Sequence, residues 1–165
     1  MRFIVADEKN IVNITQKNGF VKTAISKPEK WLLNAAFSIG LDYSILTHEI
    51  TTDLFIHSMK RHGDPEKHGK ATIKKDDFDY INEIIRKPDF AVIGAIRKTK
   101  FYNTYVKILD NITYIYFEEM LISRKNKALR GKTLYKVARP LTLYEAINII
   151  VRNNKTDISK AKILN

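Results

Sequence analysis

The sequence predicts a single α+β domain in which an antiparallel four-stranded sheet packs against helices. Its 165 residues suit one compact core. Apolar residues recur with helical spacing through the middle of the chain, whereas the stretch after Pro88 is rich in β-branched and aromatic residues. Short polar turns separate these later runs, and connections of that length join neighbouring antiparallel strands.

Four strands are expected after Pro88, separated by turns such as Asp110-Asn111. They are Phe90–Ile96, Phe101–Leu109, Ile112–Leu121 and Leu129–Ala138. An amphipathic helix from Pro140 to Arg152 closes the core, which spans residues 41–152. The polar tail, residues 153–165, is expected to fray.

Residues 1–40 are expected to form a small β-meander followed by a helix. Short apolar runs alternate with polar breaks through the first 25 residues, as in short paired strands. Ser26-Lys27-Pro28-Glu29 then indicates a helix start, and Gly40 a helix end.

Two more helices are expected between this unit and the sheet. Apolar spacing predicts one from Asp42 to about Lys60, followed by a loop from Arg61 to Pro65. The second runs from Asp76, which can cap it, to Arg86, before Pro88.

The charge of the chain points to a polyanionic partner. The sequence has 29 Lys and Arg against 18 Asp and Glu, a formal charge of +11. Nucleic acid is the commonest partner of such a compact basic domain, and charge that only maintains solubility is the alternative. Cysteine is absent, which excludes disulfides and thiolate chemistry. No signal peptide or membrane-spanning run is recognisable, so a cytoplasmic protein is expected unless a carrier or secretion system exports it.

Three histidines, His57, His62 and His68, form the densest polar group in the sequence. Their basic neighbours are Lys60, Arg61, Lys67 and Lys70. Histidine can exchange a proton near pH 7, as activation of a 2′-hydroxyl and protonation of a leaving group in RNA cleavage require. The alternatives are helix capping and a metal site. Five residues turn about 140° around a helix, which does not place His57 and His62 on one face, and no metal or other cofactor is expected.

A second group lies on the last predicted strand. Alternation puts Thr133 and Tyr135 on one face, where they could hydrogen-bond a phosphate and orient a base. Alternation puts the basic residues on the other face. The alternative interpretation of Thr133 and Tyr135 is that they occur here only because both residue types are favoured in strands. The residues on that other face are Arg130, Lys132, Leu134 and Lys136.

Tyrosines interleaved with lysines on the neighbouring strands suit a stacking platform, with Tyr116 as one candidate. Glu118 shares a face with Tyr116 and could orient a histidine or balance a lysine. Gly131-Lys132-Thr133 copies only the end of a phosphate-binding loop, so a nucleoside triphosphatase is not expected.

The order of these segments resembles the phage nucleases of the barnase, EndoU, colicin and RelE-like (BECR-fold) superfamily, which also occur as C-terminal toxin modules of contact-dependent inhibition proteins. The resemblance covers about residues 45–140. It is carried by the segments His57–Gly63, Asp76–Asp89, the tyrosine-rich strands and Lys132–Lys136.

The resemblance implies an antiparallel sheet cradled by helices, and metal-independent RNA cleavage that leaves a cyclic phosphate. It suggests His57 or His62 as general acid or base, with Thr133 and Tyr135 in the phosphate pocket. The candidate substrate-binding residues are Lys60, Arg61, Arg130, Lys132, Lys136 and Tyr116. Strand alternation places Lys132 and Lys136 opposite Thr133 and Tyr135, unless a bulge rotates them.

The leading hypothesis is therefore a toxin-type endoribonuclease that cleaves RNA by transesterification, with transfer RNA among the candidate substrates. A non-catalytic, basic nucleic-acid-binding phage accessory protein is the alternative. An acidic immunity protein or antitoxin is a compatible protein partner, because a toxic nuclease requires a neutraliser in its own cell.

Overall fold

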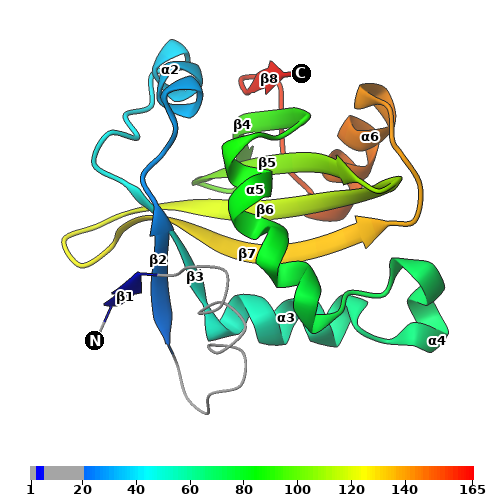
Figure 1. Cartoon of the computed structure of the whole chain (residues 1–165). Helices are drawn as coiled ribbons and strands as arrows, with labels where there is room; N and C mark the ends of the chain where they lie inside the picture. Colours follow the sequence, from blue (N-terminus) through cyan, green and yellow to red (C-terminus); the bar gives the residue numbers. More distant parts are fainter. Residues whose placement is uncertain (1–2, 6–20) are drawn as a thin grey trace.

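A twisted, mostly antiparallel sheet runs through the part of the chain that the computed structural model describes, residues 3–5 and 21–165 (Figure 1). Within those residues the sheet has eight strands in the order β1-β2-β3-β7-β6-β5-β4-β8. The α+β class is as predicted, but the sheet is wider than the four strands expected.

The four expected strands form the centre of this sheet. Each pairs with the next in antiparallel fashion, as the short turns predicted. At the Asp110-Asn111 turn both residues have positive φ, 50° and 62°, which matches the twist of a tight hairpin. The strands are β4 (Phe90–Arg97), β5 (Lys100–Leu109), β6 (Ile112–Ile122) and β7 (Lys127–Val137).

The remaining strands widen the sheet at both edges. On the β7 side, β3 (Thr47–Thr51) is parallel to β7, β2 (Lys22–Ser26) is antiparallel to β3, and β1 (Phe3–Val5) is parallel to β2. A meander was expected over the first 25 residues, and its neighbouring strands would be antiparallel, whereas β1 and β2 are parallel. Residues 1–2 and 6–20 of the expected meander lie outside the described part of the chain. On the far side β8 (Lys162–Leu164) pairs with β4, so the tail predicted to fray adds a strand.

The predicted helix from Asp42 to Lys60 is in fact β3 followed by α3 (Thr52–His62). The segment is rich in β-branched residues, and its backbone pairs with a strand on each side, which outweighs the helical spacing of its apolar residues. The loop expected from Arg61 to Pro65 is shorter, because α3 continues to His62 and a short helix, α4 (Pro65–His68), begins at Pro65. A 3₁₀ turn, η1 (Gly69–Ala71), follows α4.

The other helices lie close to their predicted positions. α2 (Lys30–Ser38) ends before Gly40, whose φ is 83°. The segment predicted as one helix from Asp76 is a 3₁₀ helix, η2 (Lys75–Tyr80), that continues into α5 (Ile81–Arg86). The helix α6 (Leu143–Asn154) begins with a capping box in which Thr142 and Glu145 bond each other's backbone amides.

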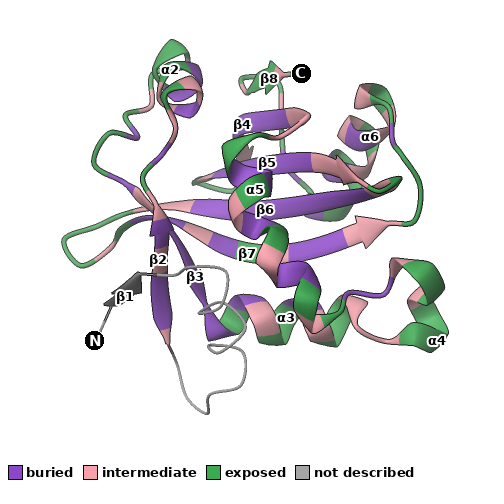
Figure 2. Cartoon of the chain, viewed as in Figure 1, coloured by how far each residue is buried: buried purple, intermediate pink, exposed green. Residues whose placement is uncertain are grey.

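Two apolar layers cover the two faces of the sheet. The larger core joins α2, α5 and one face of α3 to side chains such as Tyr105 and Leu134, and the smaller packs α6 against Val106 and Ile115. Figure 2 shows the middle of β5, β6 and β7 buried between these layers. Within the described residues, no helix is both long and apolar enough to span a bilayer.

The helix α3 lies along the edge of β7 that β3 leaves uncovered. The Leu134 amide donates to Oγ of Ser58 at 2.9 Å, so a helix side chain replaces the missing strand partner. The opposite side of α3 is thereby held beside the β7 face that carries the predicted phosphate-binding residues.

Candidate active site

A bulge at Lys132 changes which side chains of β7 share a face. Phe117 pairs with Thr133 but the next residue, Glu118, pairs with Gly131, so Lys132 has no partner on β6. The extra residue shifts the alternation, which is why Leu129 and Leu134 both reach the larger core although they are five apart. Arg130, Lys132, Thr133 and Tyr135 therefore line one cavity.

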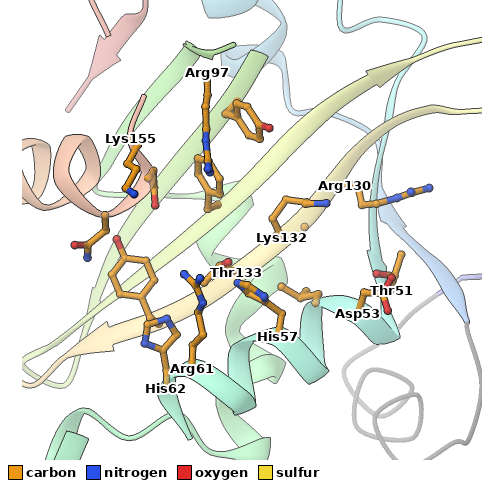
Figure 3. A pocket seen from close by; sticks show the side chains of 17 residues that line it. Thr51, Asp53, His57, Arg61, His62, Arg97, Arg130, Lys132, Thr133 and Lys155 are labelled. Carbon is orange, nitrogen blue, oxygen red and sulfur yellow. The ribbon is translucent and has the colours of Figure 1, made fainter. Parts of the chain in front are cut away.

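The cavity has a volume of about 680 Å³, and its lining side chains come mainly from α3 and β7, with others from β3, β4, β5, β6 and the end of α6 (Figure 3). Asp53, His57 and Arg61 follow each other at intervals of four residues along α3, so they form one row toward the cavity. β7 supplies the opposite wall. The end of β4 contributes Arg97, and the C-terminal end of α6 contributes residues 153–155.

The permanent charges of the cavity are mostly positive. Asp53 is the single carboxylate among its described lining residues. Five lining residues carry a permanent positive charge: Arg61, Arg97, Arg130, Lys132 and Lys155. This excess attracts a phosphate and repels a divalent cation.

His57 and His62 both reach this cavity despite the 140° between them on the helix. His62 is the last residue of α3, and its ring stacks on Tyr135, with centroids 5.2 Å apart and planes at 24°. Burial, with positive charge at His68 and Arg61, lowers the pKa of His62 to about 4. The ring is therefore neutral at pH 7 and able to accept a proton.

His57 occupies the centre of the row on α3. Partial burial, followed by the charges of Arg61, Lys132 and Lys60, lowers the pKa of its imidazole. A bound phosphate would offset these positive charges and restore the protonated form. His57 can thus hold or release a proton depending on whether an anion is present.

Two of the basic side chains of β7 are held by carboxylates. Arg130 Nε donates to Oε1 of the buried Glu49 at 2.5 Å, across the β3–β7 pairing. Lys132 Nζ lies 3.5 Å from Oε2 of Glu119, which also pairs with Lys100 at 2.7 Å. These contacts fix the direction of both side chains at the cavity wall.

The structure does not bring every predicted binding residue to the cavity. Lys136 points to the opposite face of the sheet, where its Nζ lies 2.9 Å from Oδ2 of Asp77. The bulge comes before Thr133, so β7 alternates regularly from there on and Lys136 faces away from Thr133 and Tyr135. Tyr116 is fully buried against Gly131 in the larger core, so it cannot stack on a base. Lys60 is exposed on α3 outside the cavity and acts on His57 through its charge.

Glu118 contacts a histidine outside the predicted cluster. Its Oε2 lies 2.9 Å from Nδ1 of His48 on β3, and both side chains are buried. Asn103 and Tyr105 donate to its other oxygen. This network is on the core face, away from the cavity, where it satisfies buried polar groups.

Several cavity residues were not predicted from the sequence. Phe117 is one of them, and its ring stacks parallel to the ring of Tyr102, one of the tyrosines of the expected stacking platform, with centroids 4.9 Å apart. Arg97 and Lys155 come from segments with no motif, and only tertiary pairing brings them to the site. Gly131 was an available signal, since an isolated glycine in a strand is typical of a bulge.

A family model of nucleases matches most of this chain, whereas no curated protein and no solved structure matches it. The family model described as phage-Barnase-EndoU-ColicinE5/D-RelE like nuclease 3 matches residues 26–142, more than half of the chain. The matched segment contains α3 and all four central strands. This chain belongs to the phage-Barnase-EndoU-ColicinE5/D-RelE like nuclease 3 family.

Proposed function

We propose that this nuclease-family protein is a metal-independent endoribonuclease that cleaves RNA by transesterification. The observation that carries the proposal is the placement of two histidines with lowered pKa, His57 and His62, in one cavity whose permanent charges are mostly positive. RNA supplies its own nucleophile, so a proton acceptor, a proton donor and phosphate-binding groups suffice for the reaction.

His62 is the general base in this proposal. Its neutral ring accepts the proton of the 2′-hydroxyl while that oxygen attacks the adjacent phosphorus. His57, protonated beside the bound phosphate, gives its proton to the 5′-oxygen as the P–O5′ bond breaks. The products are a 2′,3′-cyclic phosphate and a 5′-hydroxyl, and the proton taken up by His62 balances the one released by His57.

Charge on the pentavalent phosphorus needs donors in fixed positions. Arg61 shares the His57 side of α3, while Lys132 and Thr133 enter from the bulge on the facing strand. Lys132 is held by Glu119, and Thr133 lies two residues before the tyrosine that stacks on His62. The phosphate is thereby bracketed by the helix and the strand.

The proposal is tested with an oligonucleotide that contains one ribonucleotide in an otherwise deoxy strand, incubated in excess EDTA. Cleavage after the ribonucleotide, with a cyclic phosphate on the 5′ fragment, is the expected result, and the all-deoxy strand should stay intact. Equal cleavage of the all-deoxy strand would contradict a 2′-hydroxyl mechanism. Binding without cleavage would favour the non-catalytic nucleic-acid-binding protein.

A toxin role is a further part of this proposal. The formal charge of +11 suits an acidic immunity protein or antitoxin as neutralising partner. Induced expression of the wild type in a bacterial host should stop growth, whereas a His57→Ala/His62→Ala variant should not. Growth arrest by both chains would contradict toxicity through RNA cleavage.

A further inference from the structure

Three cations of the cavity have no carboxylate partner within residues 3–5 and 21–165. Arg61, Arg97 and Lys155 make no ion pair there, in contrast to the two basic residues of β7. Arg61 lies in the row with His57, at the site of the proposed chemistry. Arg97 and Lys155 lie on a different part of the wall, and Figure 3 shows both side chains entering from the side opposite α3.

The C-terminal segment brings Arg97 and Lys155 together. The amides of Ile96 and Asp157 each donate to the other's carbonyl, at 2.9 and 2.7 Å, in an antiparallel bridge. Arg97 follows one paired residue and Lys155 precedes the other by two, so the two chains run alongside each other there. The family match ends at residue 142, so α6 and the Asp157 side of this bridge lie beyond the matched segment, whereas Ile96 lies within it.

A structural role accounts for the charge of Lys155 but not for that of Arg97. Lys155 is the C-cap of α6, with φ 52°, and a cation at a helix C-terminus is favourable. That effect does not account for Arg97, which comes from a strand and faces the same space. Like charges that share a cavity and are not paired with a carboxylate repel each other, and a bound anion removes the repulsion.

We propose that Arg97 and Lys155 form a second phosphate subsite, which holds an RNA phosphodiester next to the one that is cleaved. The identification of the cleaved phosphodiester rests on the proposed function. The cavity, about 680 Å³, falls in the range of sites that enclose a whole small molecule, and it has room for more than one phosphate. Tyr102 and Phe117 line the same cavity.

Binding tests the subsite independently of cleavage. The probe is an oligodeoxynucleotide of about ten nucleotides, a length that single-strand-binding sites commonly cover and that lacks the 2′-hydroxyl. Its affinity is measured by fluorescence anisotropy across a salt series. The variants are Arg97→Gln, Lys155→Gln and the double substitution, and the controls are Lys98→Gln and Arg152→Gln, which replace neighbouring exposed cations outside the cavity.

The double variant should bind about tenfold more weakly than wild type, and its slope of log affinity against log salt should fall by about 0.7, the value for one phosphate of a single strand. Both controls should stay within about twofold. An unchanged slope in the double variant, or an equal loss in the controls, would overturn the subsite.

Turnover separates this inference from the proposed function. Arg97→Gln/Lys155→Gln should raise KM for an RNA oligonucleotide with little change in kcat, and should leave cleavage of a dinucleotide unchanged because it has one phosphodiester. Equal effects on the dinucleotide would place these residues at the cleaved phosphate and overturn the subsite. If the wild type binds but cleaves no RNA, the proposed function fails, while the binding comparison still decides the subsite.

Discussion

The imidazole of His62 stacks on the phenol ring of Tyr135, 5.2 Å between centroids, and so joins the end of α3 to the strand that carries the bulge. The contact holds a proton acceptor against the wall that presents Thr133 and Lys132. Since positioning to within about 1 Å decides rates of this kind, the stack is a direct target for substitution.

Substitution of Tyr135 separates its ring from its hydroxyl. Tyr135→Phe keeps the ring under His62, so kcat should stay within about threefold of wild type, whereas Tyr135→Ala should lower it about tenfold or more. Single-turnover cleavage of an RNA oligonucleotide measures both. A loss in Tyr135→Phe as large as that in Tyr135→Ala would instead make the hydroxyl the important group.

The low pKa of His62 fixes the acid side of the pH profile. A base is active when deprotonated, so kcat/KM should fall as the pH drops through about 4, and not through the usual histidine value near 6.5. His68→Gln removes one of the charges that depress this pKa, so the acid limb should move to higher pH. A wild-type limb near 6.5, unmoved by His68→Gln, would contradict His62 as the base.

Lys132 and Lys136 offer a matched pair, because they lie four residues apart on one strand but on opposite faces. Lys132→Gln should lower kcat/KM by about tenfold to a hundredfold, since it removes a charge at the phosphate. Lys136→Gln breaks the buried pair with Asp77 and should reduce the free energy of unfolding while leaving kcat/KM nearly unchanged. Activity and urea unfolding of both variants check this. A loss of activity in Lys136→Gln with normal activity in Lys132→Gln would contradict the position of the bulge, because it would mean that Lys136 and not Lys132 faces the cavity.

Gly131 packs against Tyr116, and a Cβ at position 131 would overlap the tyrosine hydroxyl. Gly131→Ala should therefore lower the free energy of unfolding by about 1–3 kcal/mol. Tyr116→Phe removes a hydroxyl that has no hydrogen-bond partner in the described part of the chain, so it should be nearly neutral alone and should rescue part of the Gly131→Ala loss. Strictly additive effects in urea unfolding would contradict the contact.

The central sheet was predictable because its signals are local. Runs of β-branched and aromatic residues with short turns gave β4 to β7 almost residue by residue, and the cap and stop residues gave α2, α5 and α6 within a few positions. β3 was missed because its strand character depends on two partners distant in sequence, β2 and β7. The tail was missed for the same reason, since β8 gains its order from pairing with β4.

The candidate site shows the same division. His57 and His62 stood out because they cluster in sequence, and Thr133 and Tyr135 because they alternate on a strand. The position of Lys132 depended on one inserted residue, which reverses the side on which it and Arg130 emerge. Arg97 and Lys155 lie 58 residues apart and meet through a two-bond bridge that no local pattern encodes.

The most direct test of the account is cleavage of total RNA in EDTA by the wild type, by His57→Ala/His62→Ala and by Lys136→Gln, with RNA binding measured for all three. We expect cleavage by the wild type and Lys136→Gln, no cleavage by the double variant, and binding by every chain. Cleavage retained in the double variant would contradict the histidine mechanism, and intact RNA with all three chains would contradict the assignment of this protein as a ribonuclease.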